Sequence, residues 1–200
     1  MSEKKREFVD KKRELMGDYY DLLDNLEDME LEDVKKTLRA MIKKDPDYLD
    51  PYLLLFEILL NEGNIFEADE LLDEAYARAL KLISDEKGQW PDSLEWGYLQ
   101  NRHVIRALLT KAIILWGDQF VEDALAIFRN LLACNPSDNV GARFYILAIR
   151  SGMGFDEFDE RFNKGGYYDD EILVWFDENH KKFPDEFEKW EAEIRRRGYA

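Results

Sequence analysis

Apolar residues recur along most of the chain at steps of three and four, which is the spacing of one face of an α-helix. Runs that alternate Val, Ile and Thr with polar residues, as in strands, are nearly absent. Among the charged residues, the 44 acidic side chains outnumber the 28 Lys and Arg side chains. Over residues 64–83 the apolar stripe consists of Ile65, Ala68, Leu72, Ala75, Tyr76, Ala79 and Leu80. The pattern therefore predicts an all-α protein.

Turn and capping residues separate these helices. Gly63 suits the left-handed position that ends a helix, and Asn64 with Glu67 can form a capping box for the next one. The helix before Gly63 is expected to begin near Asp50, with Pro51 in its first turn. Later helices are expected over residues 93–116, 118–136, 137–150, 155–162, 169–183 and 185–198, with Ser137 capping the third of these.

Two segments resemble the tetratricopeptide repeat, a helix–turn–helix of 34 residues. The first begins at Leu49, and its matching positions are Tyr52, Leu55, Gly63, Ile65, Ala68, Leu72 and Ala75. The second spans residues 105–138, with matches at Ala112, Ala124, Phe128 and Pro136. Phe56 stands where the family has a glycine, and the first repeat lacks the terminal proline. With two weaker repeats, the resemblance to a degenerate array covers about residues 15–165.

The resemblance implies antiparallel helix pairs stacked in a right-handed superhelix, an α-α solenoid. Two hundred residues suit one such domain. We expect an N-terminal helix within residues 1–30, repeats over 31–165, and capping helices over 166–200 that cover the last apolar face. The six Lys and Arg residues among the first thirteen are expected at a solvated helix start. The alternative is an arm that docks on the protein's own acidic face or on another copy.

Charge narrows the range of partners. The net charge of -16 argues against binding to nucleic acid or to an anionic membrane surface, and it favours basic or neutral partners. No apolar run approaches the roughly 20 residues of a membrane-spanning helix. The single cysteine, Cys134, allows no internal disulfide and fits a cytoplasmic location.

Catalytic and metal-binding patterns are weak. The two histidines, His103 and His180, lie far apart in the sequence, and we find no zinc-protease, nucleophile-elbow or phosphate-loop motif. The acidic residues between 21 and 33 lack the spacing of a calcium loop. We therefore expect no enzyme activity, no cofactor and no metal.

The candidate binding residues are an unusual group of Asn and Arg side chains at helical spacing: Asn101, Arg102, Arg106, Asn139 and Arg143. In a repeat array they would line the concave groove and hold a carboxylate or an acidic peptide. The alternative is a structural network in which Arg102 or Arg106 bonds to Asp138 or to the carbonyl end of the preceding helix.

These expectations favour a non-catalytic module that binds a partner protein or peptide in a groove. A second hypothesis is self-association as a homo-oligomer, through an aromatic surface near Trp90 and Trp96 or through the C-terminal helices. A third, an enzyme or small-ligand binder, would need a closed pocket, and the Asn and Arg group is the only polar set that could line it.

Overall fold

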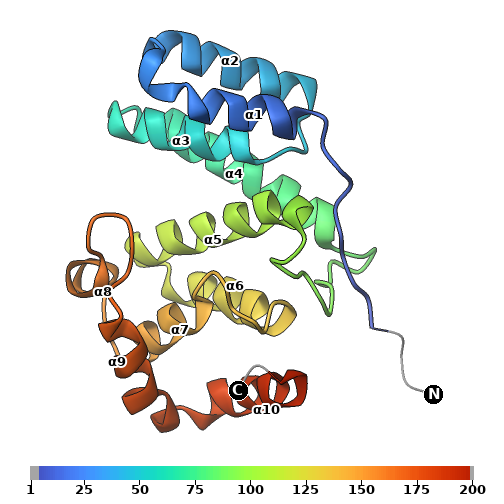
Figure 1. Ribbon diagram of the computed structural model, residues 1–200. Coiled ribbons are helices and arrows are strands. Elements are labelled where there is room, and N and C mark those ends of the chain that lie inside the picture. Colours follow the sequence, from blue (N-terminus) through green and yellow to red (C-terminus); the bar gives the residue numbers. More distant parts are fainter. Residues whose placement is uncertain (1–4, 199–200) are drawn as a thin grey trace. The chain divides into compact units, whose positions relative to one another are not determined.

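The computed structural model describes residues 5–198, which form ten α-helices and no β-strand (Figure 1). The prediction of an all-α fold is confirmed. The chain divides into two compact units, one ending at Lys111 and the other beginning at Ala112. Each unit is described by itself below. The superhelix and the domain boundaries expected from the sequence stay predictions.

The first unit is built around α3, which packs against α2 and α4. Because α3 is enclosed on several sides, it can carry the almost continuous apolar run that the sequence shows. Its helices are α1 (Leu15–Asp24), α2 (Leu31–Lys44), α3 (Asp50–Asn61), α4 (Ile65–Ile83) and the part of α5 (Arg102–Gly117) up to Lys111, with short 3-10 turns at Leu26–Asp28 and Leu99–Asn101.

The turn between α3 and α4 follows the sequence closely. Gly63 has a φ of +78°, as the end of a helix requires. The Asn64 side chain makes no capping bond to the helix backbone, however, and its amide instead donates to the Glu67 carboxylate at 2.8 Å. The buried stripe of α4 begins at Ala68, since Ile65 is half exposed.

Two helices are shorter than predicted. The segments missing from them, one near the N-terminus and one before α5, are hydrogen-bonded to each other. The segment from residue 5 to residue 13 contains no helix, and α1 begins only at Leu15; residues 1–4 lie outside the described part. The helix expected from Ser93 begins at Arg102. The extended segment, residues 5–13, is called the N-terminal arm, and it runs beside the loop that precedes α5 (Figure 1).

The second unit has an aromatic core. Its rings belong to residues spread over five helices: Trp116, Phe128, Tyr145, Phe158, Phe162 and Trp175. Its helices are the remainder of α5, α6 (Val121–Cys134), α7 (Ala142–Arg150), α8 (Phe155–Phe162), α9 (Glu171–Asn179) and α10 (Pro184–Arg197), with a 3-10 turn at His180–Lys182. Helix α7 packs against α6 and α9, and residues 199–200 of the expected C-terminal cap lie outside the described part.

The start of α7 corrects the prediction that Ser137 is its cap. Asp138 performs this role, since its carboxylate accepts the backbone N–H groups of Ala142 at 2.7 Å and Arg143 at 3.1 Å. The helix starts later than predicted because Gly141 has a φ of +75°. A Cβ atom at Gly141 would lie 3.1 Å from the Phe144 ring, so both the positive φ and the close contact favour glycine at this position.

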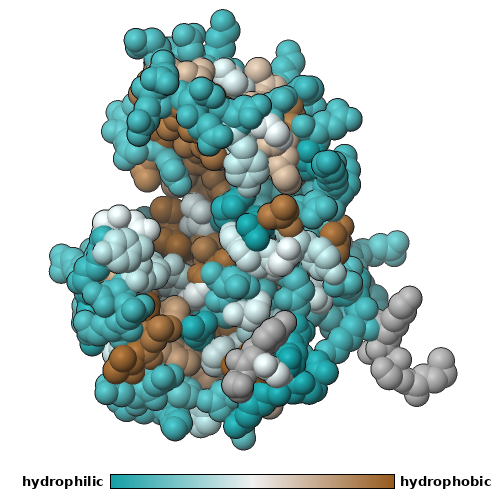
Figure 2. Space-filling model, viewed as in Figure 1, coloured by the Kyte–Doolittle hydropathy of each residue, from teal (hydrophilic) through white to brown (hydrophobic). Residues whose placement is uncertain are grey.

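Hydrophilic side chains cover most of α1 and α2 on the face shown in Figure 2. Some large apolar side chains are nevertheless exposed, among them Phe66 and Tyr167. Among the described residues, no helix combines the length and the apolar character that a membrane crossing requires.

Candidate functional site

The N-terminal arm is held as an extended peptide by the loop before α5. The Arg6 N–H donates to the Asp92 carboxylate at 2.7 Å, and the Arg6 carbonyl accepts the Asp92 N–H at 2.8 Å. The Phe8 N–H then donates to the Ser93 carbonyl at 2.9 Å. Residues 6 and 8 thus face the loop, while Glu7 between them is exposed. This alternation is how an extended segment pairs along an edge.

Asn101 completes this pairing from inside the unit. Its side chain is fully buried, and its amide contacts the arm in both directions. The Nδ2 group donates to the Phe8 carbonyl and to the Glu95 carbonyl, each at 3.1 Å, and Oδ1 accepts the Asp10 N–H at 2.9 Å. A side-chain amide offers both a donor and an acceptor, so it can replace a neighbouring strand for one residue of peptide. Asn101 therefore contacts an extended segment of its own chain, and its role in binding a partner stays a prediction.

Charged side chains anchor the two ends of the arm. The Arg6 guanidinium donates to the Ile83 carbonyl at 2.7 Å and also to the Gln89 carbonyl, which closes the loop after α4. At the other end, the buried Asp10 carboxylate accepts two bonds from Arg13, with its Nε at 2.7 Å and Nη2 at 3.0 Å. Arg13 reaches onward to Asp45, at the end of α2, at 2.9 Å.

His103 is the third partner of Asp10. Its Nδ1 accepts the Leu49 backbone N–H at 3.2 Å, so Nδ1 carries no proton. The proton is therefore on Nε2, which donates to Asp10 at 2.9 Å. Burial raises the pKa of Asp10, but the hydrogen bonds from His103 and Arg13 and the Arg13 charge outweigh it, and the net pKa is lowered. The carboxylate is thus held in its ionised form.

The predicted binding arginines of the first unit contact the loop rather than the arm. The Arg102 Nε donates to the Trp96 carbonyl at 3.2 Å, and its guanidinium lies 5.0 Å from the centre of the Trp96 ring. Arg106 forms a two-pronged bond to Asp50, with its Nε at 2.8 Å and Nη2 at 2.6 Å, and also lies over Trp96. Trp96 and Trp90, expected to be the more exposed tryptophans, are half-buried. Arg102 and Arg106 therefore stabilise the loop that receives the arm.

Asn139 and Arg143 belong to the second unit. Asn139 is exposed and accepts a bond from the Ser137 hydroxyl at 2.8 Å. Arg143 donates to the Asp138 carboxylate at 2.8 Å. Burial raises the pKa of Asp138 to about 6, against the opposing effects of the Arg143 charge and the backbone donors. The candidate set is thus divided between the units, Asn101, Arg102 and Arg106 in one and Asn139 and Arg143 in the other.

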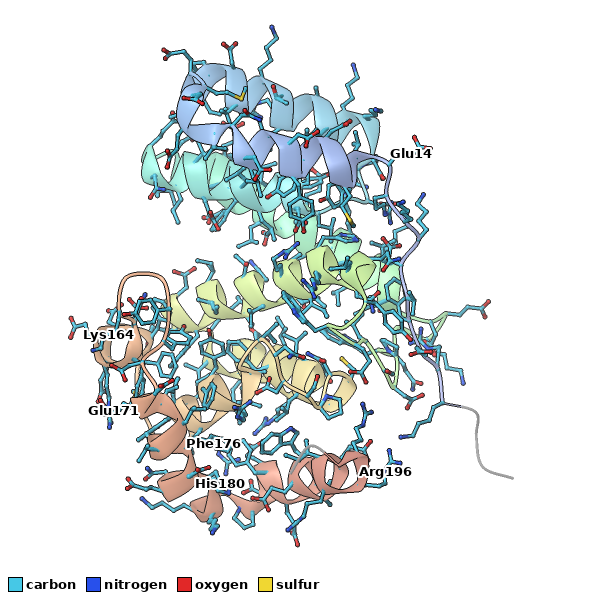
Figure 3. The ribbon with its side chains drawn as sticks, in the orientation of Figure 1. Glu14, Lys164, Glu171, Phe176, His180 and Arg196 are labelled. Carbon is cyan, nitrogen blue, oxygen red and sulfur yellow. The ribbon has the colours of Figure 1, made fainter. Side chains whose placement is uncertain are left out.

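Three aromatic rings surround the Arg143 guanidinium. Its guanidinium lies 4.1 Å from the centre of the Phe144 ring and between 5 and 6 Å from those of Phe176 and Trp190, as cation–π contacts require. Phe176 also stacks on His180, with ring centres 4.8 Å apart, and both are labelled in Figure 3. This Arg143 cluster joins α7, α9 and α10, and its cation already has a carboxylate partner.

Three of the residues that hold the arm were not identified from the sequence. Asp10 and Arg13 lie in the segment expected to be a solvated helix start, and His103 carried no motif. The one feature of the sequence that indicated a docking arm was the concentration of positive charge near the start of an acidic chain. The arm does dock, but onto backbone carbonyls, Asn101 and the buried polar residues rather than onto an acidic face.

Within residues 5–198, no group of three or more His, Cys, Asp or Glu side chains is placed to hold a metal ion. A comparison with family models, curated proteins and solved structures finds no match to this chain. The likeness to tetratricopeptide repeats therefore rests on the sequence pattern alone.

Proposed function

We propose that the protein is a non-catalytic binding module that recognises an extended peptide segment along the loop of residues 83–101. The observation that carries this proposal is the two-way bond between the Asn101 amide and the backbone of Phe8 and Asp10. We call the loop together with Asn101 the receiving site. The N-terminal arm is the segment that occupies it here.

The contacts divide into a sequence-tolerant part and a selective part. Bonds to the backbone of residues 6, 8 and 10 can form with any extended segment that is free of proline at the donor positions. Selectivity comes from the two ends of the arm. At one end, the Asp92 carboxylate and two backbone carbonyls accept hydrogen bonds from Arg6. At the other end, His103 donates to the Asp10 carboxylate. A preferred segment has an arginine followed four residues later by an aspartate.

The chemistry of the buried groups supports binding rather than catalysis. Both ring nitrogens of His103 are engaged, one by the Leu49 N–H and the other by Asp10. The ring therefore has no nitrogen left to take a proton from a substrate. Because the chain carries one cysteine, we further expect this module to act in the cytoplasm.

The test uses the full chain and a labelled peptide with the sequence of residues 4–13. In the wild type the tethered arm competes at an effective concentration of about a millimolar, so the peptide binds weakly. Arg6→Ala weakens the tethered arm but leaves the receiving site intact. Losing its charged bonds to two carbonyls corresponds to about 1.5–3 kcal/mol, so the apparent Kd of the peptide should fall at least about tenfold.

Two variants serve as controls, both read by fluorescence anisotropy. Val9→Ala changes an exposed side chain on the same arm and should bind the peptide as weakly as the wild type. Asn101→Ala, added to Arg6→Ala, should abolish the gain in affinity. Equal binding by Arg6→Ala with and without Asn101→Ala, from proteins with wild-type helicity, contradicts the proposed site.

A further inference from the structure

We propose that the partner segment is the N-terminal arm of a second copy of this chain, so that two copies exchange arms and each fills the receiving site of the other. This inference rests on the proposed function and names its partner. The protein would thereby self-associate through the arm, and each receiving site would be completed by Arg6 and Asp10 of the other copy.

The arm's contacts do not require that it belong to the same chain. Arg6 bonds to residues 77 to 86 positions away, and Asp10 bonds to residues 91 and 93 positions away. The contact to Arg13 moves with the arm. Exchange therefore preserves every one of these hydrogen bonds, which is the condition under which swapping an element is possible at low cost.

The connection between the arm and α1 can act as a hinge. Glu14 lies between Arg13 and the first residue of α1, and it is exposed (Figure 3). Its side chain makes no capping bond to the helix. A change of backbone angles at Glu14 thus loses no side-chain capping contact. The nearest backbone bond across it, from the Met16 N–H to the Arg13 carbonyl, is long at 3.3 Å.

Charge favours the arm of another copy over an arbitrary segment. The arm, residues 5–13, carries five basic and two acidic side chains, a net charge of +3, although the whole chain carries -16. The remaining residues therefore carry -19, and the arm is attracted to the body of any copy. The segment that follows the arm, residues 14–34, contains no Lys or Arg.

The arm also has weak apolar anchors, which makes its release feasible. Val9 is 43% exposed and Phe8 is only partly buried, so hydrogen bonds and two buried charges provide most of the attachment. Because exchange creates no new contacts, the exchanged dimer should become populated near the effective concentration of the tethered arm, about a millimolar. A covalent trap can detect it at lower concentrations.

The trap uses Glu7 and Ser93, which are paired in a parallel backbone bridge between the arm and the loop. In a Cys134→Ala background, one chain carries Glu7→Cys and another carries Ser93→Cys. The two are mixed, oxidised with glutathione and separated on a non-reducing gel. Arm exchange predicts a disulfide-linked heterodimer in at least severalfold excess over a control pair. In the control, Asp69→Cys, at an exposed position of α4, replaces Glu7→Cys. Asn101→Ala in the Ser93→Cys chain should reduce the heterodimer to the control level.

A chain carrying both Glu7→Cys and Ser93→Cys supplies the matching intramolecular reaction. If it closes its own disulfide while the mixed chains give no more than the control, the arm stays on its own chain and the exchange is overturned. Failure of both reactions overturns the pairing of the arm with the loop, and exchange with it. Peptide binding by Arg6→Ala without heterodimer formation would leave the proposed function standing and remove only this inference.

Discussion

Replacing Asp10 by Asn tests whether the buried charges hold the arm in place. The substitution keeps the size of the side chain and one oxygen that can accept from His103. It removes the negative charge between Arg13 and His103 and points an amide N–H₂ toward one of them. Arg13, whose side chain is 1% exposed, would keep only the carboxylate of Asp45.

Breaking a buried ion pair by removing one partner costs about 3–5 kcal/mol in general. Here the arm can detach and expose Arg13 to water. The loss in the free energy of unfolding therefore cannot exceed the free energy with which the arm is bound to the rest of the unit. We therefore expect the free energy of unfolding to fall by about 2–4 kcal/mol at pH 7. Glu7→Gln, on the same arm but exposed, should change it by less than about 0.5 kcal/mol.

The same variant has a defined pH dependence. The pKa of Asp10 is lowered in the folded protein from its ordinary value of 3.8. Its contribution to stability is therefore fully present above pH 3.8 and is lost as the pH falls through the folded pKa. The difference in stability between wild type and Asp10→Asn should shrink as the pH falls below about 4.

Urea denaturation followed by circular dichroism gives both quantities, and trypsin cleavage after Lys11 or Lys12 reports release of the arm. Asp10→Asn should be cut in the arm faster than Glu7→Gln. A loss of stability below about 1 kcal/mol at pH 7, with unchanged cleavage of the arm, would show that these buried charges do not hold it.

Two further predictions concern the second unit. Gly141→Ala should lower the free energy of unfolding by about 1–3 kcal/mol, because this position combines a positive φ with a tight contact to Phe144. The control is Gly152→Ala, at φ +78° with no neighbour within 4 Å, which should lower it by about 1 kcal/mol. Equal losses for the two variants in denaturant melts would refute the contact to Phe144. The hydroxyls of Tyr145 and Tyr168 bond at 2.8 Å, so either change to Phe should cost about 1–2 kcal/mol and the double change less than the sum; additive losses in a double-mutant cycle would show that the two hydroxyls do not interact.

The local parts of the fold were predictable from the sequence. Helix α4 begins directly after the predicted cap, Asn64, and ends at the predicted Ile83, because the signals that define it, Gly63 just before it and the stripe from Ala68, are local in the sequence. The start of α5 was not predictable in this way. Residues 93–98 have helical spacing, but their backbone groups pair in part with an arm some 85 residues earlier in the sequence.

The same limit applies to the candidate site. Arg102 and Arg106 are one turn apart on a helix, and both guanidinium groups lie over the Trp96 ring. Their partners could not be read from it, since Asp50 lies 56 residues before Arg106 and appeared in the sequence as an ordinary helix-start residue. Only the packing of α3 and α5 within the first unit brings the two side chains within 2.8 Å of each other.

The pairing of the arginines changes what the candidate site can recognise. A free guanidinium would select an acidic segment, but Arg106 is already matched by a carboxylate and Arg102 by a carbonyl. The group left to contact a peptide is the neutral amide of Asn101, which reads backbone rather than charge. Positive charge is then supplied by the bound segment through Arg6, and the acidic body attracts it. Under the proposed function, the polarity of recognition is thus the reverse of the one that the arginines suggested, and a basic segment is the ligand to test first.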